Sequence, residues 1–166
     1  MENLERLLEE LLSQEKELQF PAFRNDDALS LGMRLVERAK AEGKSVTVDI
    51  CRNGQQLFHC ALPGTSADND AWIRRKNNVV NHYGHSSFYV GTQFRAKNKT
   101  FEQSSRLDVS QYAAHGGAFP VIVRDVGVVG TVTVSGLPQE EDHSLVVQVL
   151  REFLAGYSSR ASSLRS

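Results

Sequence analysis

Basic and aromatic residues after the Gly-Thr-Ser loop at 64–66 are the clearest candidates for chemistry in this 166-residue sequence. Such a loop entering a helix exposes backbone N–H groups, and helix N-termini bind anions readily. Trp72, Arg74, Arg75 and Lys76 follow on the same predicted helix. Arginine and lysine bind carboxylates or phosphates through charge-assisted hydrogen bonds. The segment therefore indicates a site for an anionic ligand.

Lys76 is unusual because helical spacing places it in an otherwise apolar stripe that includes Val79, Val80 and Tyr83. A buried ammonium is costly unless it is paired. One interpretation is that the lysine stem packs while the ammonium reaches the edge of the helix. The other is that Lys76 contacts a ligand. The spacing leaves both open.

His115-Gly116-Gly117 is a second candidate. Paired glycines let a backbone approach a ligand closely, although they also simply turn a chain. In the predicted site Trp72 supplies a flat apolar contact, the basic side chains hold carboxylates and the glycines give backbone access. The full predicted set is Trp72, Arg75, Lys76, His115, Gly116 and Gly117.

Two carboxylates are predicted to support this site, Asp49 and Asp142. Asp142 shares an inward helical stripe with Val146 and Val149, so we expect a buried partner such as Lys76 or an arginine. A carboxylate in the first turn of a helix is also favoured by the helix dipole without any further role.

The histidines do not indicate a metal site. His82 and His85 straddle Gly84 at a predicted helix end, and His59 is expected on the apolar face of its strand. The sequence has no zinc-spaced Cys/His set, P-loop, G-x-G-x-x-G or G-x-S-x-G motif. We therefore predict no bound metal and assign no catalytic residue.

Composition is that of an ordinary soluble protein, with 40% hydrophobic and 23% charged residues. The net charge of −1 gives no overall attraction to nucleic acid or to an anionic membrane. No apolar run approaches the roughly 20 residues of a membrane helix. The acidic start MENLERLLEELL is unlike a signal peptide. We expect a cytoplasmic protein.

The two cysteines are expected to remain reduced thiols. If Asn53-Gly54 forms a two-residue turn, Cys60 pairs with Thr47. Cys51 then lies about four residues away along the ladder, roughly 13 Å at the usual strand rise. That separation is too large for a disulfide.

The N-terminal segment 1–18 reads as an amphipathic helix, because leucines recur at helical spacing between charged residues. The leucines form a broad apolar face. This face either packs against another subunit or covers the sheet of its own chain, and the sequence leaves both open.

Helices and hairpins alternate along the rest of the chain. A helix ending near Gly43 precedes a hairpin of strands 46–52 and 55–62, whose core face carries residues 46, 48, 50, 57 and 61. Helices follow at 67–83 and after Ser86 or Ser87, then a short helix from Asp108 to the glycine pair. Strands 119–124 and 128–135 form a second hairpin, and the last helix is closed by Gly156.

This order predicts an α+β sandwich with an antiparallel sheet covered by helices. We predict one domain over residues 1–157 and a disordered tail over residues 158–166.

Three stretches resemble a known family: VTVDICRNGQQLFHCALPGT, then WIRRK, then GGAFPVIVRDVGVVGTVTVSGLPQEEDH. Together they are similar to the haem-degrading-domain family, also called HbpS-like or GlcG-like, and to its small cytosolic branch found in bacteria and fungi. The resemblance covers roughly residues 20–157. Its most specific part is the hairpin ending in G-x-V-x-V-S-G before an acidic helix start.

The resemblance implies a profilin-like or PAS-like α+β fold with a five-stranded antiparallel sheet. It also implies dimers that build larger rings. Some relatives bind haem, and the family is named for degrading it. This sequence lacks the export signals of secreted members, and no residue in it matches a known haem ligand.

The predicted function is a cytoplasmic, homo-oligomeric ligand-binding protein, with haem or another anionic small molecule as ligand. A haem-degrading enzyme is the first alternative, and an oligomeric scaffold for other proteins is the second.

Overall fold

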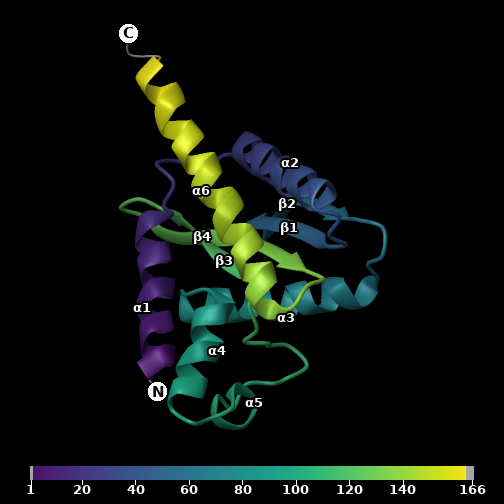
Figure 1. Cartoon of the computed structure of the whole chain (residues 1–166), viewed down its shortest axis with the longest axis vertical. Coiled ribbons are helices and arrows are strands. Elements are labelled where there is room, and N and C mark those ends of the chain that lie inside the picture. The colour runs from purple at the N-terminus through teal and green to yellow at the C-terminus, as the bar shows by residue number, and fades with distance from the viewer. Residues whose placement is uncertain (1, 164–166) are drawn as a thin grey trace.

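A computed structural model describes residues 2–163, with side chains described for residues 3–157 (Figure 1). The elements, in chain order, are α1 (Glu2–Glu17), α2 (Asn25–Ala41), β1 (Thr47–Arg52), β2 (Gln55–Ala61), α3 (Ala67–Tyr83), α4 (Ser87–Ala96), α5 (Phe101–Ser104), β3 (Ala118–Val123), β4 (Gly127–Ser135) and α6 (Gln139–Ser163).

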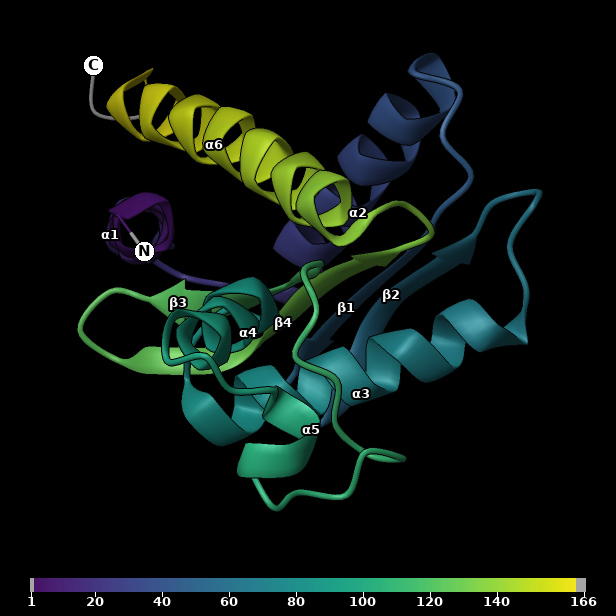
Figure 2. The same cartoon turned by 60° about the horizontal axis from the view of Figure 1, so that its bottom comes forward.

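The strands form one antiparallel sheet in the order β2-β1-β4-β3. Helices α2 and α6 cover one face, and α3 crosses the other (Figure 2). The α+β sandwich predicted from the sequence is therefore confirmed. The five-stranded sheet implied by the resemblance is wrong, because the sheet within residues 2–163 has four strands. Phe20 makes a single bridge to Val123, and Pro21, which has no N–H, follows it.

The main core lies between the sheet and the helices α2 and α6. Its fully buried side chains include Leu31 and Leu35 of α2, Val48 and Ile50 of β1, and Leu150 of α6. Val and Ile suit the sheet side of such a core because their branched side chains pack well on a pleated surface.

A β-bulge changes which side chains of β2 face this core. The register shifts between Ile50 and Cys51, so that Ile50 lies opposite Phe58 and Cys51 opposite Gln56. Phe58 and Cys60 consequently pack against the core, and His59 turns to the α3 side. The prediction that Leu57 faces the core is confirmed, but the predicted faces are wrong beyond the bulge, where Cys60 lies opposite Val48 rather than Thr47. Both cysteines are free thiols, as expected.

Two helix predictions also need correction. No helix starts at Asp108; a turn occupies 109–111, and the short α5 lies earlier, at Phe101–Ser104. The last helix does not end at Gly156 but continues to Ser163, because this glycine keeps an ordinary helical φ. Residues 158–163 of the expected disordered tail are thus helical, and 164–166 lie outside the described residues.

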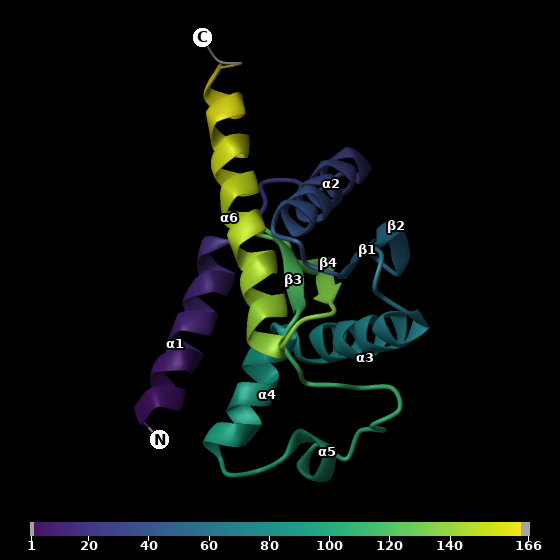
Figure 3. The same ribbon diagram turned by 45° about the vertical axis from the view of Figure 1, so that its right-hand side comes forward.

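Helix α1 packs against α4 rather than directly on the sheet (Figure 3). Leu11 is buried there with Phe88 and Tyr89. The Glu15 carboxylate accepts from the Ser86 backbone N–H at 2.8 Å and lies 2.7 Å from His85 Nδ1. Apolar burial and a buried carboxylate together hold α1 to the start of α4.

Candidate functional site

Lys76 of α3 is fully buried, with only 2% of its surface exposed. Oxygen atoms of the protein accept all the hydrogen bonds that its ammonium can donate. Nζ donates to the carbonyl oxygens of Val134 at 2.8 Å and Gly116 at 3.1 Å, and to Asp142 Oδ2 at 3.3 Å. An ammonium has three protons, so none remains for a ligand. The buried Lys76–Asp142 pair expected from the sequence is present. The ammonium joins α3, β4 and α6 instead of reaching the helix edge.

The Lys76–Asp142 pair shifts the pKa values of both groups. Burial lowers the pKa of Lys76, and the Asp142 charge opposes this shift. Burial likewise raises the pKa of Asp142 to about 6. The charge of Lys76 and the backbone N–H of Leu137, which donates to Asp142 Oδ1 at 3.0 Å, both oppose this rise. The Asp142 carboxylate therefore both holds Lys76 and satisfies the chain entering α6.

Gly116 and Gly117 are buried at this junction, where they allow the backbone to pass close to its neighbours. A Cβ on Gly117 would lie 2.4 Å from Lys76 Nζ and 2.4 Å from the Val134 oxygen, and its φ is +134°. A Cβ on Gly116 would lie 2.2 Å from the Gln139 oxygen. Internal packing accounts for both glycines.

The other three predicted residues, Trp72, Arg75 and His115, contact one another beside this junction, where they are partly exposed. The Trp72 and His115 rings lie edge-on with centroids 5.3 Å apart. The Arg75 guanidinium stacks over Trp72, 4.1 Å from the ring centroid, as cation–π contacts favour. Burial lowers the pKa of His115, and the charges of Lys76, Arg95 and Arg75 lower it further while Glu102 opposes them. The imidazole is therefore neutral at pH 7.

Beside this ring lies a small pocket of about 210 Å³, which we call the His115 pocket. Its lining includes Arg95, Lys99 and Glu102, with His115 Nε2 3.8 Å from Glu102 Oε1. Arg95 and Lys99 were not predicted, although the basic run R-A-K-N-K at 95–99 is a visible signal. With Arg75, cationic side chains outnumber the single carboxylate.

Asp49 lies apart from this site, on the sheet face below α3. It is buried and accepts from Gln56 at 2.6 Å, from Cys51 at 3.2 Å and from Asn77 at 3.2 Å. His59 Nδ1 lies 3.2 Å from it. Asp49 therefore organises a buried polar layer between sheet and helix rather than supporting the residues around His115.

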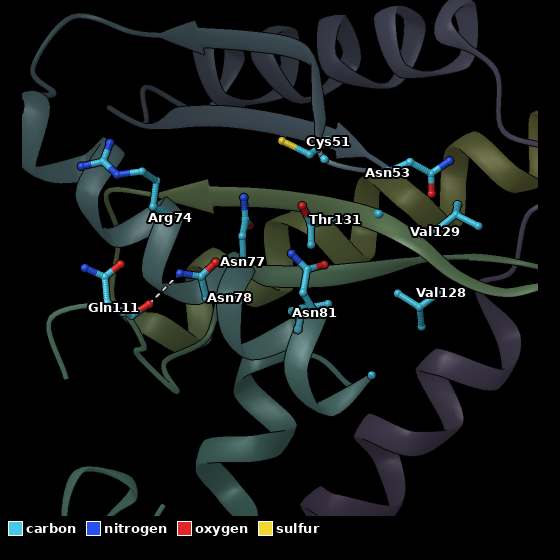
Figure 4. A pocket seen from close by; sticks show the side chains of 14 residues that line it. Cys51, Asn53, Arg74, Asn77, Asn78, Asn81, Gln111, Val128, Val129 and Thr131 are labelled. Atoms are coloured by element: carbon cyan, nitrogen blue, oxygen red, sulfur yellow. Dashed lines mark hydrogen bonds between the residues drawn. The ribbon is translucent and has the colours of Figure 1, made fainter. Parts of the chain in front are cut away.

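A larger pocket of about 510 Å³, the α3–β4 pocket, opens between α3, β4 and the β1–β2 turn (Figure 4). Its walls are polar and apolar in about equal measure, with Arg74, Asn78 and Asn81 from α3, and Thr131 and Val128 from β4. Of the residues that line this pocket, only Arg74 belongs to a site predicted from the sequence. Scattered amides carry no motif, and their grouping depends on how α3 crosses the sheet.

Comparison with known proteins identifies relatives of this chain. Residues 23–151 match the family model described as "Haem degrading protein HbpS-like". A UPF0303 protein of Streptomyces coelicolor is 61% identical over 145 residues, covering 87% of this chain and 92% of the relative.

No helix within residues 2–163 is both long enough and apolar enough to cross a membrane.

Solved structures agree with this assignment. The crystal structure of the Ybr137w protein superposes with a TM-score of 0.82 at 38% identity, covering 92% of this chain and 94% of that one. A PduOC:heme complex superposes with a TM-score of 0.60 at 18% identity over 80% of this chain and 94% of that one, which shows a shared fold. This chain therefore belongs to the HbpS-like family of haem-degrading proteins.

Proposed function

We propose that this protein is a cytoplasmic homo-oligomer that binds a small anionic molecule at the His115 pocket. The observation that carries the proposal is the excess of positive charge there. Arg95 and Lys99 line the pocket with a neutral imidazole and one carboxylate, Glu102, and the charge of Arg75 acts on His115 from its place over Trp72. Cations grouped in a partly desolvated hollow attract carboxylates and phosphates, and Arg forms strong charge-assisted bonds with both.

Haem is the first ligand to test, because of the family description and because PduOC, a structural neighbour, is described in complex with heme. The donor set fits. A neutral His115 can donate its Nε2 lone pair to iron, Trp72 offers an apolar ring, and Arg95 and Lys99 suit the propionates. At about 210 Å³ the pocket is smaller than the roughly 300–1,000 Å³ usual for small-molecule sites, so it would not enclose a whole macrocycle. Bound haem would supply redox chemistry at its iron.

Trp72 makes the test direct, because it is the only tryptophan in the chain. Haemin added to the protein should quench Trp72 emission to a saturating value. The double variant Arg95→Gln/Lys99→Gln should weaken this binding at least about tenfold, since each lost charge-assisted bond contributes about 1.5–3 kcal/mol. The matched control Arg6→Gln, on the exposed face of α1, should leave it unchanged.

Two results would overturn the anion site: quenching that never saturates, or saturating quenching that is the same in the double variant. Adding ascorbate, a reductant, to the haem-bound protein distinguishes the haem-degrading enzyme from a protein that only binds haem. A haem band that falls with product release indicates an enzyme, and a band that is unchanged over hours indicates binding alone.

The oligomer is supported by α1, whose leucines are only partly covered by α4. Leu4, Leu7, Leu8 and Leu12 remain half-buried, a broader apolar face than α4 occupies. Light scattering should give a mass above one chain, and Leu8→Glu should lower it. A monomeric mass across a wide concentration range would contradict the proposal. A scaffold role would instead appear as a protein partner that is retained when His115 is replaced.

A further inference from the structure

The α3–β4 pocket has a cationic end that the fold leaves without a counterion. Figure 4 shows Asn78 beside Gln111 at this end, with the exposed side chain of Arg74 extending outward from α3 on the same side of the pocket. Asp70 lies one helical turn before Arg74, but its Oδ1 is 2.9 Å from His59 Nε2 instead. Among the side chains of residues 3–157, none forms an ion pair or hydrogen bond with the Arg74 guanidinium. The pocket therefore offers a fork of N–H donors suited to a carboxylate.

The middle of the pocket is lined by groups that both donate and accept hydrogen bonds. Asn78 Nδ2 donates to the backbone oxygen of Gln111 at 2.8 Å, which leaves Asn78 Oδ1 free to accept. The amide of Asn81 has no partner in the described part of the chain. The Thr131 hydroxyl is buried beside the Cys51 thiol. Such groups pair well with an amide, which also carries one donor and one acceptor.

The opposite end is apolar, with Val128 and Val129 beside Asn53 (Figure 4). Val128 is 40% exposed, which leaves its methyl groups free to contact a ligand. A sugar or polyol would make little apolar contact with these valines, whereas a hydrocarbon group would bury their apolar surface.

The floor of the pocket is held rigid. Asn77 donates to Asp49 at 3.2 Å and accepts from Thr133, and the Cys51 thiol donates to Asp49 at 3.2 Å. Burial, with the Asp49 charge, raises the pKa of Cys51 to about 12, so the thiol stays protonated. A preformed floor with an inert thiol suits reversible binding rather than covalent chemistry.

We propose that the α3–β4 pocket binds a small amphipathic carboxylate with an amide in its middle, of the class of N-acylated amino acids. The carboxylate lies at Arg74, the amide at Asn78 and Asn81, and the apolar group against Val128. The volume of about 510 Å³ falls within the roughly 300–1,000 Å³ usual for small-molecule sites. This site is separate from the His115 pocket and does not depend on it.

Two matched probes test the proposal, N-acetyl-leucine and N-acetyl-leucinamide, which differ only in the carboxylate. Titrated into the protein and followed by NMR, N-acetyl-leucine should give saturable shifts, and the amide should bind at least about tenfold more weakly. Arg74→Gln should remove the difference between the probes. Val128→Asp, at an exposed position, should weaken both. Arg6→Gln is the control for loss of a surface cation and should change neither.

Four results would overturn the proposal. One is no saturable shift with N-acetyl-leucine up to about 10 mM, where even a weak millimolar site fills. The second is equal binding of the two probes. The third is a preference for the carboxylate that persists in folded Arg74→Gln protein, because that preference would then arise elsewhere. Binding of either probe with no effect of Val128→Asp would likewise place the site outside this pocket.

Discussion

The ammonium of Lys76 lies 3.3 Å from the carboxylate of Asp142, and both groups are buried where α3, β4 and α6 meet. The same ammonium also donates to two backbone carbonyl oxygens, that of Val134 near the end of β4 and that of Gly116 in the glycine pair. A lysine that looks like a ligand contact in sequence is therefore a structural link. The surface that we propose as the binding site lies beside it, at Trp72, Arg75 and His115.

Lys76→Met should destabilise the protein strongly, because it leaves a buried carboxylate and two carbonyls without their donor. Loss of one partner of a buried pair costs about 3–5 kcal/mol. Urea unfolding of Lys76→Met, Asp142→Asn and the double variant measures this. The double variant should lose less stability than the sum of the single losses. A loss below about 1 kcal/mol for Lys76→Met would contradict the structural role.

Gly117→Ala should be destabilising by more than about 2 kcal/mol, since a Cβ there meets Lys76 Nζ and the Val134 oxygen at 2.4 Å each and φ is +134°. Gly156→Ala is the matched control, because in α6 an added Cβ meets nothing within 4 Å. The control should stabilise by about 0.5–1 kcal/mol. Thermal melts of the two variants should shift in opposite directions; equal shifts would show that the crowding at Gly117 is relieved easily.

His143 should make the protein less stable in acid. The ring is buried, Nε2 lies 2.8 Å from Gln14 Oε1, and burial lowers the pKa from 6.5 to about 4. Between these pH values the unfolded chain binds a proton that the folded chain does not. Stability therefore falls as pH drops from 6.5 to 4, by up to about 3 kcal/mol.

His143→Gln removes this titration while keeping a polar group near Gln14. The raised pKa of Asp142 acts in the opposite direction, since its folded form keeps a proton to higher pH, and it is common to both proteins. The difference in unfolding free energy between wild type and His143→Gln should thus shrink from pH 7 to pH 4. A difference that is constant with pH would mean that His143 takes up its proton at the same pH in the folded chain as in the unfolded chain.

Cys51 should resist alkylation. Burial and the Asp49 charge raise the pKa of its thiol to about 12, so the thiolate that reacts is scarce at pH 8. Iodoacetamide labelling of a Cys60→Ser variant isolates this thiol. The rate should be orders of magnitude below that of the urea-unfolded chain, and Asp49→Asn should increase it. Labelling of the folded protein at the unfolded rate would show that Cys51 is open and ionised.

Local patterns predicted the elements well where short-range chemistry decides them. The Ala67–Tyr83 helix lies where the sequence placed it, ended by Gly84 with a φ of +72° and started by Ser66. Phe58 and His59 show what such patterns miss. One extra residue at the bulge reverses the faces of β2, and no residue type at that point signals it.

The candidate site could be predicted only in part. Trp72, Arg75 and His115 were brought together correctly, because aromatic and basic side chains near a helix are visible in sequence. The saturation of Lys76 by two distant carbonyls was not visible, since it depends on how β4 and α6 meet α3. The α3–β4 pocket was missed for the same reason.

A haemin titration followed by the Soret band tests the proposed function most directly. Wild type should show a saturable, stoichiometric shift that is lost in His115→Ala and kept in His82→Ala, a matched exposed histidine at the end of α3. A weak shift that does not saturate, or a saturable shift that survives His115→Ala, would contradict haem binding at the His115 pocket.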